Sequence, residues 1–147
     1  MSQTGTILVV DDEPEIVTLL KFILEKDGHR ILEAGNGMVA LERLGVEPPS
    51  PEAPKPDLII LDIMMPVMDG YSCLRELNAR YGRAHFPVII LTARDRMKDL
   101  FALEGIEDYV VKPFDHEDLL IRIERAFKRR AVDEAAASQP PPPVKAA

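Results

Sequence analysis

Acidic residues that directly follow apolar runs are the feature of this 147-residue sequence with the clearest chemical meaning. The run 58–61 ends in Asp62, and the run 6–10 ends in the adjacent acids Asp11 and Asp12. If both runs are strands of one parallel sheet, their carboxyl ends meet in the crevice where such folds bind ligands. Three carboxylates held together there raise one another's pKa values unless a divalent cation neutralises them. Oxygen ligands of this kind favour Mg²⁺, and Mn²⁺ can substitute for it.

Two further polar residues end apolar runs in the same way. Thr92 follows the run 87–91, and Lys112 follows the run 109–111. With a cation bound, Asp62 can act as an anionic nucleophile toward phosphorus and form an aspartyl phosphate. Phosphoryl transfer depends mainly on positioning and on neutralising charge on the phosphoryl oxygens, which the Lys112 ammonium and the Thr92 hydroxyl can do. These residues therefore predict phosphoryl transfer to Asp62.

The elements that must position these residues alternate regularly along the chain. The predicted strands cover residues 6–10, 30–34, 57–61, 87–91 and 109–111. The predicted helices run from Pro14 to a stop at Gly28, over 38–44 behind an Asn36 cap, over about 70–81, over about 96–104, and from an Asp115 cap to about 130. Five such pairs predict an α/β fold of three layers: a flavodoxin-like, doubly wound (βα)5 architecture with a parallel five-stranded sheet in the order 2-1-3-4-5.

Three segments depart from the regular pattern. Residues 47–56 contain five prolines, which predicts an extended surface loop with polyproline character. Its composition favours a solvated insertion over a partner-binding segment. The segment 94–108 is short, so its helix is expected to be truncated or irregular. Residues 131–147 are rich in Ala and Pro and are expected to form a flexible tail or linker after a domain at 5–130.

The composition argues against several functional classes. The net charge of -7 disfavours direct binding of nucleic acid, because that task needs a basic face. The single cysteine, Cys73, excludes an internal disulfide, and no apolar run is long enough to cross a bilayer. We therefore expect a domain that works in the cytoplasm without membrane or nucleic-acid contacts.

The stretch 55–70 resembles the phosphoacceptor segment of the receiver domains of two-component response regulators. The resemblance extends over about 5–130, and its motif residues are Asp11, Asp12, Asp62, Pro66, Asp69, Gly70, Thr92, Tyr109, Lys112 and Pro113. It implies a phosphoprotein of phosphorelay signal transduction rather than a metabolic enzyme. The phosphate would come from the phosphohistidine of a histidine kinase or a histidine phosphotransfer protein.

The same resemblance implies a role for each matched residue. Asp62 is the phosphoacceptor, helped by Thr92 and Lys112. The implied metal ligands are Asp11, Asp12, Asp62 and the main-chain carbonyl of Met64. Thr92 and Tyr109 form a switch, and the turns depend on Pro66, Gly70 and Pro113, with a cis bond between Lys112 and Pro113. A downstream protein or a second receiver would bind the face formed by the fourth helix, the fifth strand and the fifth helix.

Other interpretations of the same residues stay open at this stage. A phosphatase of the haloacid dehalogenase type also uses an aspartyl phosphate, Mg²⁺, Thr and Lys, but it needs an acid where this chain has Met64. A degenerate receiver would only bind proteins. Taken singly, the acid pair could merely favour a helix N-terminus, and Tyr109 could be an ordinary core residue.

Overall fold

Short runs of Val, Ile and Leu form the strands. They are β1 (Thr6–Val10), β2 (Arg30–Ala34), β3 (Leu58–Asp62), β4 (Val88–Ala93) and β5 (Asp108–Lys112). Within the residues that the structure describes, 4–82 and 85–138 of a computed structural model, the strands pair in parallel in the order β2-β1-β3-β4-β5. Every residue of β3 is buried, which explains a run without polar alternation. The flavodoxin-like fold class is therefore confirmed.

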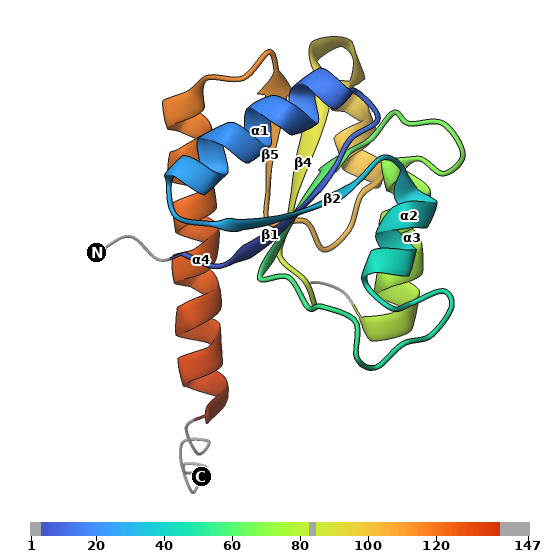
Figure 1. Ribbon diagram of the computed structural model, residues 1–147, viewed down its shortest axis with the longest axis vertical. Coiled ribbons are helices and arrows are strands. Elements are labelled where there is room, and N and C mark those ends of the chain that lie inside the picture. Colours follow the sequence, from blue (N-terminus) through green and yellow to red (C-terminus); the bar gives the residue numbers. More distant parts are fainter. Residues whose placement is uncertain (1–3, 83–84, 139–147) are drawn as a thin grey trace, which may run out of the picture.

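Helical segments connect the strands and cover both faces of the sheet. They are α1 (Pro14–Lys26), α2 (Gly37–Arg43), α3 (Gly70–Tyr81), the 3-10 helix η1 (Arg94–Ala102) and α4 (His116–Ser138). Helices α1 and α4 lie on one face, and α2 and α3 lie on the other (Figure 1). As predicted, the Asn36 side chain caps α2, where it accepts a hydrogen bond of 3.0 Å from Val39 N.

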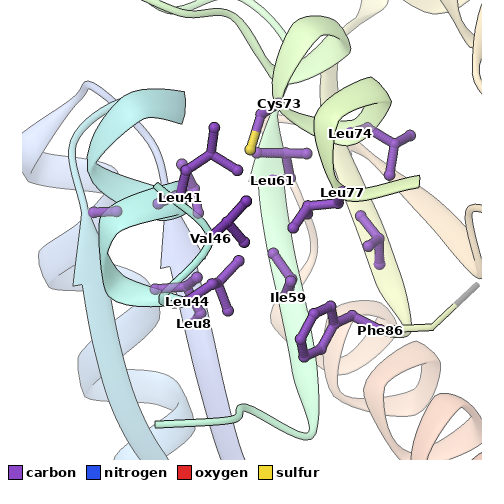
Figure 2. Packing of buried hydrophobic residues seen from close by; sticks show 14 of the residues in the cluster. Leu8, Leu41, Leu44, Val46, Ile59, Leu61, Cys73, Leu74, Leu77 and Phe86 are labelled. Atoms are coloured by element: carbon purple, nitrogen blue, oxygen red, sulfur yellow. The ribbon is translucent and has the colours of Figure 1, made fainter. Parts of the chain in front are cut away.

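The core on the α2 and α3 side fixes the position of β3. Figure 2 shows the side chains of Leu41, Leu44, Val46, Cys73, Leu74, Leu77 and Phe86 gathered around Leu8, Ile59 and Leu61. Burying one such aliphatic side chain stabilises the fold by roughly 1.5–3 kcal/mol. Because the cluster packs along the length of β3, it fixes the position of Asp62 at the end of this strand.

The fourth helical segment is a 3-10 helix rather than an α-helix, and it covers 94–102 instead of the expected 96–104. This agrees with the expectation that the short segment 94–108 would hold a truncated or irregular helix. Its apolar residues Met97 and Leu100 are three positions apart, which suits a helix with three residues per turn.

The last helix is longer than predicted. Helix α4 continues past the expected end at about 130 to Ser138. The reason is the composition of residues 131–138, where Ala and Glu are strong helix formers and no proline intervenes. The prolines at 140–143 lie outside the described residues, so the flexible tail and the domain boundary at 130 remain proposals.

The proline-rich loop is exposed, as predicted, but it is turned rather than extended. Ser50 N donates to the carbonyl of Gly45 at 2.8 Å, and Ala53 N donates to Ser50 O at 3.2 Å. Gly45 has a φ of 71°, and a Cβ there would overlap Ser50 O. The prediction of a polyproline conformation was wrong because local hydrogen bonds close the chain into consecutive turns.

Within the described part of the chain, no helix combines the length and the hydrophobicity that crossing a lipid bilayer requires.

Candidate functional site

Four carboxylates meet at the carboxyl edge of the sheet. Asp11, Asp12 and Glu13 follow β1, and Asp62 ends the neighbouring strand β3. One carboxylate oxygen from each lies within 4.8 Å of the others. Asp11 and Asp62 are buried, with 1% and 5% of their surface exposed, whereas Asp12 and Glu13 are exposed. The predicted meeting of Asp11, Asp12 and Asp62 is therefore observed, with Glu13 as an additional member.

Lys112, at the end of β5, reaches into this acidic cluster. Its Nζ lies 2.8 Å from Asp11 Oδ2, 3.3 Å from Glu13 Oε1 and 3.4 Å from Asp62 Oδ2. Asp11 also accepts a hydrogen bond of 2.9 Å from Glu13 N through its other oxygen. One ammonium thus neutralises part of the charge of three carboxylates.

The pKa values of Asp62 and Lys112 are both raised, but by different causes. Burial, together with the charge of Asp11, raises the pKa of Asp62 to about 6, although Lys112 opposes the shift. Burial alone would lower the pKa of Lys112. Its close contact with Asp11 and the charges of Asp62, Asp11 and Glu13 outweigh that effect, so the pKa of Lys112 is raised. The ammonium therefore stays charged, while the acidic cluster keeps an excess of negative charge.

Thr92 lies beside the acids, and Tyr109 lies apart from them. In the sheet Asp62 pairs with Leu91, so Thr92 stands one residue beyond that pair at the end of β4. Its hydroxyl is buried and donates to Ala93 O at 3.2 Å. Tyr109 is 36% exposed on β5, where the Arg122 guanidinium lies 5.7 Å from the centre of its ring.

A family model for the response regulator receiver domain matches residues 7–124. The chain belongs to this receiver-domain family. Members of the family are signalling domains controlled by phosphorylation and not metabolic enzymes. The resemblance to receiver domains that the sequence shows is thereby confirmed.

Curated proteins and solved structures agree with this assignment. The receiver domain is 39% identical over 128 residues to the alkaline phosphatase synthesis transcriptional regulatory protein PhoP of Bacillus subtilis, covering 86% of this chain and 50% of that protein. It is 34% identical over 132 residues to the probable transcriptional regulatory protein TcrX of Mycobacterium tuberculosis, covering 88% and 53%. The chain thus spans about half the length of these relatives.

Two solved receiver domains have the same fold. The receiver domain of the Francisella response regulator 1452 matches with a TM-score of 0.72 and 32% identity, covering 86% of this chain and 98% of that one. A receiver domain protein from Clostridium thermocellum matches with a TM-score of 0.73 and 33% identity, covering 87% and 98%. Both matches extend over nearly the whole of the solved chain.

The turn that follows β3 in this receiver domain is closed by backbone contacts. Gly70 N donates to Ile63 O at 2.8 Å, and Met68 N donates to Pro66 O at 2.8 Å. A Cβ on Gly70 would overlap the main-chain oxygen of Asp62, so only glycine fits there. Asp69 then caps α3 by accepting a hydrogen bond of 2.7 Å from Ser72 N. The turn roles predicted for Pro66 and Gly70 have this local basis.

Two residues at the rim of the site, Glu13 and Met64, differ in what the sequence predicted for them. No role was predicted for Glu13 from the sequence, although its position as the third acid in a row was a usable signal. The side chain of Met64 is 52% exposed, and the role predicted for its main-chain carbonyl remains a proposal.

The bond between Lys112 and Pro113 is cis, as expected from the resemblance.

The residues present fit a divalent cation. Receiver domains generally bind Mg²⁺ in an acidic pocket, and this cluster offers carboxylate oxygens, the donors that Mg²⁺ prefers. Asp11 Oδ2 is buried and, among the described residues, accepts no hydrogen bond of good geometry, although the Lys112 ammonium lies next to it. A buried carboxylate oxygen left in this state is suited to a metal ion.

Proposed function

We propose that this receiver domain accepts a phosphoryl group on Asp62 from the phosphohistidine of a histidine kinase or a histidine phosphotransfer protein. The observation that supports this most is the position of Asp62 at a strand end, buried among acids and 3.4 Å from Lys112 Nζ. An acceptor needs a nucleophilic oxygen next to groups that neutralise the incoming charge. Both requirements can be met by groups of this site.

In the proposed reaction a carboxylate oxygen of Asp62 forms a bond to phosphorus. The bond between phosphorus and the imidazole nitrogen of the donor breaks, and that nitrogen keeps the electron pair. Later attack by water on phosphorus releases inorganic phosphate and restores the Asp62 carboxylate. Asp62 must be ionised to act as nucleophile, so its pKa of about 6 lets it react at neutral pH.

We assign the supporting roles as follows. Asp11, Asp12, Asp62 and the main-chain carbonyl of Met64 would hold Mg²⁺, or Mn²⁺ in its place. When bound, the ion neutralises negative charge on the carboxylates and on a phosphoryl oxygen. Lys112 pairs with a second phosphoryl oxygen, and the Thr92 hydroxyl leaves Ala93 O to donate to a third.

The movement of Thr92 would link the acceptor to the partner surface. Once the hydroxyl turns toward the phosphoryl group, space opens behind it that the ring of Tyr109 can enter from its exposed position. The face formed by η1, β5 and α4 would change shape and bind a downstream protein or a second receiver. A local event can do this only if both conformations already lie within a few kcal/mol of each other.

The context proposed for this domain is the cytoplasm, where a kinase phosphohistidine is available to it. The domain itself would make no direct contact with nucleic acid or membrane, because its net charge is -7. The curated relatives PhoP and TcrX are named as transcriptional regulatory proteins. Any such output would belong to a part of the protein other than the receiver fold.

Incubation with acetyl phosphate and Mg²⁺, followed by intact-mass measurement, tests the proposal. We expect one added phosphate in the wild type and none in Asp62→Asn or after chelation of the metal. Asp133→Asn, which changes an exposed carboxylate on α4, should be loaded like the wild type. A degenerate receiver would take up no phosphate, and a phosphatase of the haloacid dehalogenase type would turn over small phosphate esters repeatedly.

The switch needs a separate experiment. Beryllofluoride should bind at Asp62 and shift amide signals around Tyr109 in the wild type. Thr92→Ala should still bind it but lose the distant shifts. Undiminished shifts around Tyr109 in Thr92→Ala would show that the coupling does not run through Thr92.

A further inference from the structure

The side chain of Glu13 makes a contact that its position in the helix does not require. Glu13 is the N-cap residue of α1, where a short polar side chain usually accepts a hydrogen bond from the first turn. In the described structure its carboxylate makes no such cap and instead lies 3.3 Å from Lys112 Nζ. The main chain of Glu13 does the local work: its carbonyl accepts hydrogen bonds from Ile16 N and Val17 N, and its N–H donates to Asp11.

Lys112 occupies the oxygens that a divalent cation would need. Its ammonium lies against Asp11 Oδ2 and near Asp62 Oδ2, on carboxylates proposed as metal ligands. Two cations cannot both remain within contact distance of these oxygens without strong repulsion. Binding of Mg²⁺ must therefore move Lys112 away from Asp11, at the expense of a buried ion pair.

Of the three carboxylates around Lys112 in the described structure, Glu13 is the one without a proposed metal role. Its side chain is 59% exposed, whereas those of Asp11 and Asp62 are 0% and 8% exposed. An exposed arm can follow the ammonium when the ammonium leaves the buried oxygen.

We propose that Glu13 is a positioning residue that receives the Lys112 ammonium when the cation takes its place on Asp11. This inference rests on the proposed function, because it concerns the same site. The Glu13 carboxylate lowers the cost of displacing Lys112 and keeps the ammonium beside Asp62, within reach of a phosphoryl oxygen. Glu13 acts on metal affinity through Lys112 and not as a ligand of the ion.

A double-mutant cycle separates an indirect from a direct effect. The dissociation constant for Mg²⁺ is measured from amide shifts of the full chain in four proteins: wild type, Glu13→Gln, Lys112→Met and the double variant. Because the pair is partly exposed, we expect Glu13→Gln to weaken binding about three- to fivefold. Lys112→Met should strengthen binding, since the resident cation is gone. In the Lys112→Met background, Glu13→Gln should change the affinity by less than about twofold.

Glu15→Gln is the matched control. Glu15 lies two positions further in the first turn of α1, is exposed and has no hydrogen bond or ion pair in the described structure. It removes the same unit of charge close to the site, so its effect measures general electrostatics. The effect of Glu13→Gln should clearly exceed it.

A second measurement follows the ammonium itself. In protein with ¹³Cε- and ¹⁵Nζ-labelled lysine, saturation with Mg²⁺ should leave the Lys112 signals sharp and restrained in the wild type. In Glu13→Gln they should become averaged by motion. A merely structural role of Glu13 would not change the Lys112 signals selectively.

The outcomes distinguish this inference from the proposed function. If the loss of affinity on Glu13→Gln is equally large with and without Lys112, then Glu13 acts on the ion directly and the inference is overturned. Absence of any loss in the wild-type background overturns it as well. If the wild type binds no Mg²⁺, or if Asp62→Asn leaves the affinity unchanged, the proposed metal site itself is wrong.

Discussion

Two clusters of charged residues in this molecule each place one cation among two or more carboxylates. They differ in burial and in the number of carboxylates that surround the cation. At the carboxyl edge, Lys112 meets Asp11, Glu13 and Asp62, and its side chain is 15% exposed. On the β5 and α4 side, Arg122 pairs with Asp108 and with Asp118, and its side chain is 28% exposed.

The difference shows which cluster is available for chemistry. At the carboxyl edge four acids face one ammonium, and two of the acids are buried, so negative charge is in excess where water cannot screen it. Burial and this excess of charge raise the pKa of Asp62, and the excess suits a divalent cation. On β5 and α4 the guanidinium is shared between two partly exposed carboxylates, an arrangement that adds little stability.

The largest effect on stability should come from a side chain that clashes with the backbone next to the acidic cluster. Gly70→Ala places a Cβ against the main-chain oxygen of Asp62, which cannot move without disturbing β3. We expect a loss of about 3 kcal/mol or more in the free energy of unfolding, measured by urea denaturation. Gly35→Ala is the control, since nothing in the described structure lies within 4 Å of a Cβ at that position. Equal losses for the two variants would contradict the tight approach at Gly70.

The next effect concerns the excess charge itself. The pKa of Asp62 is about 6 in the folded protein, against an ordinary value of 3.8 for this side chain, so the folded state binds this proton more tightly than the unfolded state. The contribution of Asp62 to stability is then fully present below pH of about 4 and is lost as pH rises through about 6. Without metal, Asp62→Asn should therefore be more stable than the wild type by up to about 3 kcal/mol at pH 7.

This gain has a defined pH window. It should be complete above pH of about 6 and should disappear near and below pH of about 4, where Asp62 is protonated in both states. Asp12→Asn, at an exposed acid of the same cluster, should give a smaller gain. Thermal unfolding of both variants across this range provides the test, and a gain that does not change with pH would have another cause.

Addition of Mg²⁺ should act on the acidic edge alone. A ligand that binds only the folded state at about ten times its dissociation constant adds about 1.4 kcal/mol of stability. We expect this gain in the wild type and in Arg122→Met, and its loss in Asp11→Asn. Melting temperatures with Mg²⁺ and with chelator measure it. A gain that survives in Asp11→Asn would move the ion away from this cluster.

The smallest effect should come from the more exposed cluster around Arg122. Arg122→Met keeps most of the apolar stem but removes the pairs with Asp108 and Asp118 and the contact over Tyr109. We expect a loss below about 1 kcal/mol that shrinks as salt is added. Urea denaturation at low and high salt measures it. A loss as large as that of Gly70→Ala would show that the two clusters are less different than their exposure indicates.

Much of the fold could be predicted because it depends on short-range patterns. Apolar runs without alternation marked the central strands, and the residues after them marked the strand ends. Local composition misled in two places. The prolines of 47–56 suggested an extended loop, but hydrogen bonds between Gly45 and Ser50 close it. The composition after 130 suggested that the last helix ends there, but its alanines continue α4 to Ser138.

The candidate site divides along the same line. By itself the sequence determined which residue types stand at the strand ends, because a parallel sheet brings the carboxyl ends of its strands to one edge whatever the details of packing. Only the tertiary structure decided that Glu13 contacts Lys112, 99 positions away. It also decided that Asp62 is buried enough to hold its proton to a pKa of about 6. Both facts depend on distances and burial between distant segments, and these arise only when the layers of the sheet and its helices pack together.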